Sequence, residues 1–183
     1  MGSLHKVVID GSNFMCRLIE RDYHTYFIDG KASLSGLNAR LQHWIRRDVG
    51  THRCIGMDFF YSGKVFGAKN QKLTTEDTKA LIERFGREQG VNVKKVDIRG
   101  EQEKGIDVAV AACLMESADI CETLVLISSD TDYVPALEAM KRKGRYVITA
   151  GFSANHPVEL INISYIFYDL DEIYFNSLKE EYQ

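Results

Sequence analysis

The sequence lacks the features that mark secreted and membrane proteins. It contains no apolar run of about 18 residues, the length that a membrane-spanning helix needs, and no charged-then-apolar leader segment. Its four cysteines form no Cys-x-x-Cys pair, so we expect neither a disulfide framework nor a structural zinc site. These absences predict a cytoplasmic protein that has no membrane partner.

Positive charge is also scarce for a protein that would bind nucleic acid. The 23 lysines and arginines are outnumbered by 26 acidic residues, and the formal net charge is −3. Nucleic-acid binding would therefore depend on local patches. Candidate basic residues are Lys94, Lys95, Arg99, Lys104 and the cluster Lys141-Arg142-Lys143 with Arg145. Candidate aromatic residues for stacking on bases are Phe14, Tyr23, Tyr26 and Phe27.

Glycine-rich phosphate loops and histidine metal motifs are absent as well. Neither a Walker-type loop nor a Gly-x-Gly-x-x-Gly turn follows a candidate strand. The 5 histidines show no paired spacing of the kind that zinc enzymes use. These absences argue against P-loop, dinucleotide-binding and zinc chemistry.

What the sequence does contain is the alternation of an α/β protein. Its 183 residues, 45% of them hydrophobic, match one ordinary domain over residues 1–183. Short β-branched runs alternate with longer amphipathic ones, which predicts a three-layer α/β/α domain with a mostly parallel central sheet. The expected strands are Leu4–Asp10, Cys54–Tyr61, Val91–Ile98, Thr123–Ser128, Arg145–Thr149 and Tyr165–Tyr168. The expected helices are Ser35–Arg47, Thr75–Gln89, Asp107–Ser117, Asp132–Lys143 and Asp171–Glu181.

Two smaller features complete this interpretation. The segment Arg21–Ser35, which contains Asp29-Gly30, is predicted to be an irregular excursion or a hairpin. The two prolines, Pro135 and Pro157, both lie where the first turn of a helix would tolerate them.

Aspartates follow two of the expected strands and begin one of the expected helices. Asp10 ends the first strand, Asp130 and Asp132 follow the fourth, and Asp107 starts the Ala-rich helix. Ligands of open α/β sheets collect at the carboxyl ends of the strands, so these carboxylates are expected at one edge. Each aspartate alone could be a helix cap or a turn residue. Together they repel one another unless a cation neutralises them, and an all-oxygen ligand set suits Mg²⁺ or Mn²⁺.

The same residues carry a resemblance to a known family. Ile9-Asp10-Gly11-Ser12-Asn13-Phe14 resembles the opening motif of the NYN family, which is LabA-like and related to the PIN-like nucleases. Lys104-Gly105-Ile106-Asp107-Val108-Ala109 and the run from Ser128 to Pro135 resemble two further elements of that family, in the same order. The three motifs extend from the first expected strand to the fifth. The resemblance implies a PIN-like fold and metal-dependent cleavage of RNA phosphodiester bonds.

Carried over by position, the resemblance implies a set of site residues. Asp10, Asp107, Asp130 and Asp132 would be catalytic and would bind one or two metal ions. Asn13, Lys104 and Ser129 would bind the substrate. The sequence departs from the family pattern at Ser129, where glycine is common, and at Tyr133, which replaces phenylalanine. A serine side chain at residue 129 would narrow the approach to the metal.

Several alternatives remain beside a ribonuclease. One is an inactive PIN-like module that binds RNA or a protein partner, and a homodimer is also left open. Asp10-x-Ser12 prompts comparison with a von Willebrand-type adhesion site, but that site requires a second serine where Phe14 lies. A haloacid dehalogenase-type phosphatase requires an aspartate at the place of Ser12. The partner expected from the resemblance is therefore nucleic acid, RNA rather than DNA.

Overall fold

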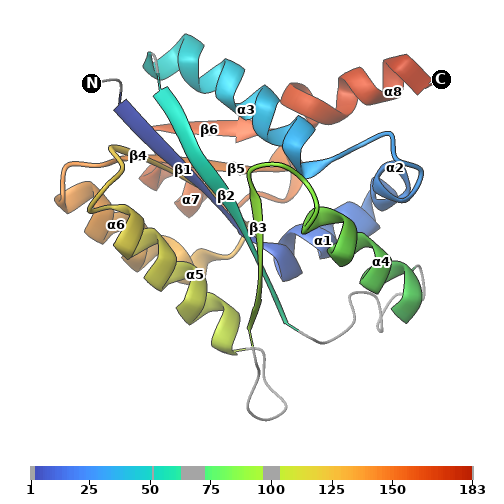
Figure 1. Ribbon diagram of the computed structural model, residues 1–183. Coiled ribbons are helices and arrows are strands. Elements are labelled where there is room, and N and C mark those ends of the chain that lie inside the picture. Colours follow the sequence, from blue (N-terminus) through green and yellow to red (C-terminus); the bar gives the residue numbers. More distant parts are fainter. Residues whose placement is uncertain (1–2, 51, 63–72, 97–103, 183) are drawn as a thin grey trace.

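A parallel β-sheet organises the chain. The computed structural model describes residues 3–50, 52–62, 73–96 and 104–182. In these residues the sheet has six strands in the order β3-β2-β1-β4-β5-β6, and every pair of neighbours is parallel (Figure 1). The strands are β1 (Ser3–Asp10), β2 (His52–Ser62), β3 (Val91–Val96), β4 (Thr123–Ile127), β5 (Tyr146–Gly151) and β6 (Ile166–Asp169).

Helices cover both faces of this sheet and make three layers (Figure 1). One face carries α1 (Gly11–Glu20), α2 (His24–Ile28), α3 (Leu34–Val49), α4 (Thr75–Phe85) and α8 (Asn176–Tyr182). The other face carries α5 (Lys104–Ser117), α6 (Val134–Arg142) and α7 (Val158–Ile163). Two 3-10 turns, η1 (Thr131–Tyr133) and η2 (Ser153–Asn155), and one π-helical segment, η3 (Asp171–Phe175), complete the order. The predicted α/β/α architecture is confirmed, and the sheet is wholly parallel.

Strand β1 joins the two halves of the core. Successive side chains of a strand point to opposite faces, so Val7 and Ile9 belong to the hydrophobic cluster under α1–α4, whereas Val8 belongs to the cluster under α5–α7. All three side chains are fully buried. Because β1 pairs with β2 on one side and with β4 on the other, the sheet grows in both directions from it. The crevice between the carboxyl ends of β1 and β4 is therefore the topological switch point, where open α/β sheets bind ligands.

The structure corrects the prediction for Arg21–Ser35. This segment is no hairpin, because it contains the short helix α2 and the start of α3. Phe27 of α2 is buried in the core, and Gly30, with φ of 78°, follows the end of that helix instead of turning between two strands. Helices α1 and α7 were also not expected. No helix in the described part of the chain is long and apolar enough to cross a membrane.

Candidate active site

Asp10 lies at the centre of the switch point. It is the last residue of β1 and the N-cap of α1, because its Oδ1 accepts a hydrogen bond of 3.0 Å from the backbone N–H of Asn13. Its Oδ2 accepts hydrogen bonds from the hydroxyls of Ser128, at 3.3 Å, and Tyr133, at 3.0 Å. The residue is 3% exposed. Asp10 therefore caps α1, and the same hydrogen bonds hold its carboxylate at the bottom of the crevice.

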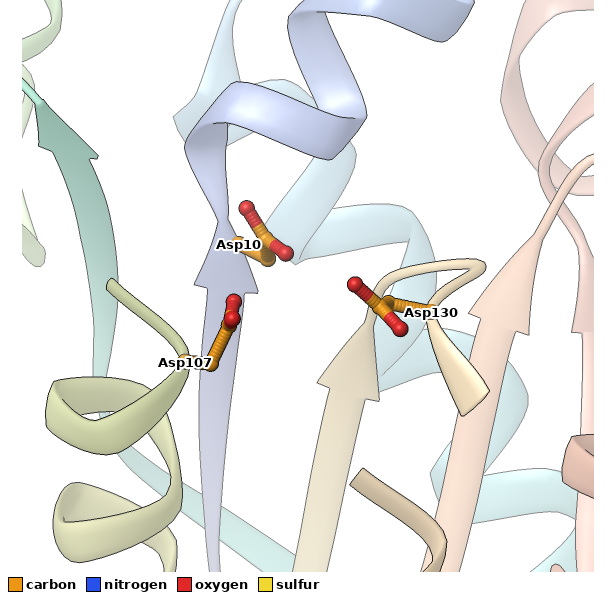
Figure 2. Close-up of side chains that lie close together, drawn as sticks. All are labelled: Asp10, Asp107 and Asp130. Carbon is orange, nitrogen blue, oxygen red and sulfur yellow. The ribbon is translucent and has the colours of Figure 1, made fainter. Parts of the chain in front are cut away.

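Two further carboxylates approach Asp10 from other elements (Figure 2). Asp107 lies in the first turn of α5, and Asp130 follows β4 as the N-cap of η1. One carboxylate oxygen of each of the three residues lies within 4.8 Å of the others. This spacing and the all-oxygen donor set fit a hard divalent cation such as Mg²⁺ or Mn²⁺. Among the described residues, no lysine or arginine forms an ion pair with Asp10 or Asp130.

The three carboxylates disturb one another electrostatically. Burial raises the pKa of Asp10 from its ordinary value of 3.8 to about 6. The hydrogen bonds from Asn13 and Tyr133 lower this pKa, and repulsion from Asp107 and Asp130 raises it. The protonated form is therefore favoured far more than in water. A cation bound among the three residues would favour the charged form instead.

The hydroxyl of the buried residue Tyr133 contacts both Asp10 and Asp107. Its hydroxyl lies 3.0 Å from Oδ2 of Asp10 and 3.3 Å from Oδ1 of Asp107, and the residue is 1% exposed. Burial and the nearby carboxylates raise the pKa of this hydroxyl, so it stays protonated and donates. The sequence singled out Tyr133 only as a departure from the family pattern. Its contact with two carboxylates was missed, although an added hydroxyl within an acidic motif is a signal that could have revealed it.

Asn13 and Ser129 meet across the crevice. The side-chain Oδ1 of Asn13 accepts a hydrogen bond of 2.9 Å from the backbone N–H of Ser129, which ties α1 to the loop after β4. Ser128 also bridges the two segments, because its hydroxyl donates to Asp10 and accepts from the backbone N–H of Asp130. The substrate-binding role of Asn13 and Ser129 stays a prediction.

The remaining predicted residues differ in their placement. Asp132 is exposed, and the structure leaves its carboxylate outside the group of three; its backbone N–H donates to Oδ1 of Asp130 at 2.9 Å. Lys104 begins α5, and its side chain lies outside the described residues, as does Arg99.

A cavity of about 410 Å³ opens above the carboxylates. Its walls come from the loop after β4, the first turn of α5 and one side of α1. The residues that line it are Asp10, Ser12, Asn13, Cys16, Arg17, Glu20, Ile106, Asp107 and Asp130. The site is therefore open enough for a small ligand to reach all three aspartates.

The sequence pattern of the NYN domain matches residues 7–174, nearly the whole chain and all three acidic positions. The chain belongs to the NYN domain family. Membership in the PIN-like superfamily follows from it, and the resemblance noted in the sequence is confirmed.

Solved structures add a comparison at the level of fold. The NYN domain is similar to a protein of unknown function from Vibrio parahaemolyticus, with 18% identity, 93% of this chain and 94% of that chain covered, and a TM-score of 0.58. A putative UDP-N-acetylglucosamine 2-epimerase from Listeria monocytogenes aligns with 8% identity and a TM-score of 0.46, over 100% of this chain and 42% of that chain. Curated proteins give no match to this chain.

The NYN domain places two groups of proposed RNA contacts away from the site. Phe14, Tyr23 and Phe27 are buried in the core, so the stacking role is wrong for them, and Tyr26 packs partly buried against the same core. The cluster at 141–145 begins in the last turn of α6, a helix that starts beside the aspartates and ends at the opposite edge of the sheet. There Lys141 bonds to the carbonyl of Ile163 and Lys143 pairs with Asp119.

A further proposed basic contact, Lys94, is engaged by a buried carboxylate, and the RNA-binding role of exposed Lys95 stays a prediction. Lys94 lies 2.7 Å from the buried carboxylate of Asp58, which also pairs with Lys6 at 2.6 Å. Burial would raise the pKa of Asp58, but hydrogen bonds from Lys6, Lys94 and Asn92 outweigh it and lower the pKa to about 2. Lys94 thus stabilises the buried negative charge of Asp58 beneath α5.

Proposed function

We propose that this NYN domain is a divalent-metal-dependent ribonuclease that hydrolyses phosphodiester bonds of single-stranded RNA. The observation that carries the proposal is the group of Asp10, Asp107 and Asp130, which lies at the switch point within a cavity open to solvent. Three carboxylates from distant segments repel one another. If each aspartate served only as a helix cap or turn residue, there would be no reason for the three to lie together. The cytoplasm is the expected location.

In this proposal the three aspartates hold Mg²⁺ or Mn²⁺, and exposed Asp132 adds a carboxylate for a second ion. The bound cation would polarise the phosphate and lower the pKa of an attacking water. In the hydrolysis, the water oxygen bonds to phosphorus while the bond from phosphorus to the leaving oxygen breaks; the water gives up one proton to solvent, and the leaving oxygen takes up one proton from solvent. Tyr133 fixes the orientation of Asp10 and Asp107 through its hydroxyl. Asn13, Ser129 and Lys104 are proposed to contact the substrate.

Cleavage of labelled single strands tests this proposal. Wild-type protein and Asp10→Asn are incubated with RNA and with DNA of the same sequence, with Mn²⁺, with Mg²⁺ and with chelator. We expect metal-dependent cutting of RNA by the wild type and a loss of at least about 100-fold in Asp10→Asn, in the range for a ligand of a catalytic ion. Asp119→Asn, an exposed aspartate at the opposite edge of the sheet, is the matched control and should cut normally.

The outcomes distinguish a ribonuclease from an RNA-binding module and from an enzyme that prefers DNA. Equal cutting by wild type and Asp10→Asn contradicts the catalytic assignment. A wild-type protein that shifts the RNA strand but cuts it under no metal is an RNA-binding module with an inactive PIN-like fold. Preference for the DNA strand contradicts the assignment of the substrate.

A further inference from the structure

One side of α1 forms a polar wall that leads away from the aspartates. Ser12, Asn13, Cys16, Arg17 and Glu20 recur at helical spacing, and all of them line the cavity above the site. Arg17 lies five residues along the helix from Ser12, a rise of about 7.5 Å, and helical side chains lean back toward the helix N-terminus. The wall therefore begins at Ser12, next to the aspartates, and presents a guanidinium about one nucleotide further along.

Within the protein, the guanidinium of Arg17 makes only weak polar contacts. Its Nη1 lies 2.9 Å from Oε2 of Glu20, and the side chains are 28% and 43% exposed. The amide of Asn155 in η2 lies 3.3 Å from the same nitrogen. Half-exposed ion pairs contribute only about 0–1 kcal/mol, so a stronger anion can displace Glu20. The Nε of Arg17 is buried, and no described residue accepts a hydrogen bond from it.

The cavity itself limits what this wall can bind. Its volume of about 410 Å³ lies in the lower part of the range for small-ligand sites, which suits one nucleotide unit and not a duplex. A guanidinium offers a planar fork of donors that matches phosphate oxygens. The hydroxyl of Ser12 is likewise buried at this wall without a described partner.

We infer that Arg17 binds the phosphate next to the scissile one in a single-stranded nucleic acid, and that Glu20 limits the strength of this binding by competing for the guanidinium. The inference rests on the proposed function, because that function places the scissile phosphate at the aspartates. Arg17 would be a substrate-binding residue, with no part in the bond-breaking step. Glu20 would also repel the incoming strand by its charge.

Binding of a fluorescent single-stranded oligouridylate, measured by anisotropy in Mg²⁺, tests this inference. All variants are made in the Asp10→Asn protein so that the strand stays intact. Arg17→Gln should weaken binding roughly tenfold, the value of one charge-assisted hydrogen bond. It should also reduce the slope of log affinity against log salt by about 0.7, as expected when one phosphate contact is lost in a single strand.

Three further variants separate binding from structure. Arg17→Lys keeps the charge and should retain the salt slope. Glu20→Gln should tighten binding, an effect that a purely structural ion pair would not produce. Arg142→Gln removes an exposed arginine that pairs with Glu138 four residues earlier on α6, and it should change nothing.

The outcomes test the role of Arg17 separately from the ribonuclease proposal. Binding that is unchanged in Arg17→Gln and in Glu20→Gln overturns the role of Arg17 and leaves the ribonuclease proposal standing. Binding that depends on Arg17 in a protein whose wild type cuts no strand supports the phosphate contact and contradicts catalysis. A protein that binds no single strand at all overturns both.

Discussion

At the residue scale, Asp10 combines deep burial with the negative charges of Asp107 and Asp130. A pKa raised from 3.8 to about 6 means that ionising Asp10 costs the folded, metal-free protein up to about 3 kcal/mol at pH above 6. Because the folded pKa is the higher one, the penalty is absent below pH 4 and grows as the pH rises to about 6. The site therefore opposes folding until a cation balances its charge.

This penalty predicts that Asp10→Asn stabilises the metal-free protein at pH 8. An asparagine is neutral, and the hydroxyls of Ser128 and Tyr133 can rotate to accept from its amide. We expect a gain of about 1–3 kcal/mol in the free energy of unfolding at pH 8, and little or none near pH 4. Urea denaturation in the presence of chelator measures both values.

A control shows whether the gain comes from the buried charge. Asp132→Asn changes an exposed aspartate two residues after Asp130 and should leave the unfolding free energy unchanged at both pH values. A loss of stability at pH 8 in Asp10→Asn would show that the hydrogen bonds of this carboxylate outweigh its charge penalty.

Tyr133 gives a second prediction at this scale. Tyr133→Phe keeps the buried ring and removes only the hydroxyl that contacts Asp10 and Asp107. Groups that orient metal ligands typically account for about 10–100-fold in metal affinity or activity. We expect Mn²⁺ affinity, measured by calorimetry, to fall at least about tenfold while the circular dichroism spectrum stays the same.

Tyr168→Phe is the matched control for this change. It removes a hydroxyl of a buried tyrosine that bonds to Asp48 at 3.1 Å, away from the site. Its Mn²⁺ affinity should equal that of the wild type. Equal affinity in Tyr133→Phe would mean that the three carboxylates keep their geometry without this hydrogen bond.

The residues of the site differ in how far the sequence could predict them. Asp10 and Asp130 follow buried strands and Asp107 begins a helix, so strand direction alone brings them to one edge. The hydroxyl of Tyr133 was not predicted to reach the site, because the direction of a side chain depends on packing between η1 and α5. Arg17 escaped notice because its helix was not expected.

At the scale of elements, the junction of β1 and α1 sets the position of Asp10. Gly11 follows it directly, and a Cβ on Gly11 would lie 2.4 Å from the carbonyl oxygen of Phe60 and 2.5 Å from the ring of Phe59. Phe59 is fully buried, so neither neighbour can move easily. A larger residue at position 11 would push α1 away from β2.

The junction predicts that Gly11→Ala is costly. Overpacking of this kind destabilises a protein by about 1–3 kcal/mol, and the shift of α1 should also reduce the affinity for Mn²⁺. Urea denaturation and calorimetry measure the two effects. Gly86→Ala is the control, since its nearest described atoms lie 3.6 Å away and its backbone is helical. Equal stability of the two variants would contradict this account of the junction.

Elements with a clear period were predicted well, and elements that begin with turn residues were not. β1, β4 and β5 are buried, β-branched runs whose existence is visible in sequence. The start of α1, Gly11-Ser12-Asn13, has the composition of a turn, and its helix forms because Asp10 caps it. After α2, Asp29-Gly30 ends the helix and does not connect two strands.

For the whole molecule, β1 contributes to both hydrophobic clusters, so neither half of the core can be lost alone. We therefore expect one cooperative unfolding transition, in keeping with a single domain over residues 1–183. Fluorescence of Trp44, the 1 tryptophan of the chain, reports on α3, whereas far-ultraviolet circular dichroism reports on all helices. The two urea curves should coincide, and separate midpoints would indicate two folding units.

The same curves address self-association. A homodimer remains a prediction, and a transition midpoint that rises with protein concentration would support it. A midpoint independent of protein concentration would indicate that the monomer folds stably without dimerisation.

The hydrogen bond between Asn13 and Ser129 joins helix α1 to the loop after β4, across 116 residues of the chain. It involves neither cation nor substrate, so it forms as the protein folds. The backbone around the aspartates has therefore already lost its conformational entropy when a cation arrives, and little remains to be ordered on binding. The rate at which a cation exchanges at the three aspartates should therefore be limited by dehydration of the ion and not by rearrangement of the protein.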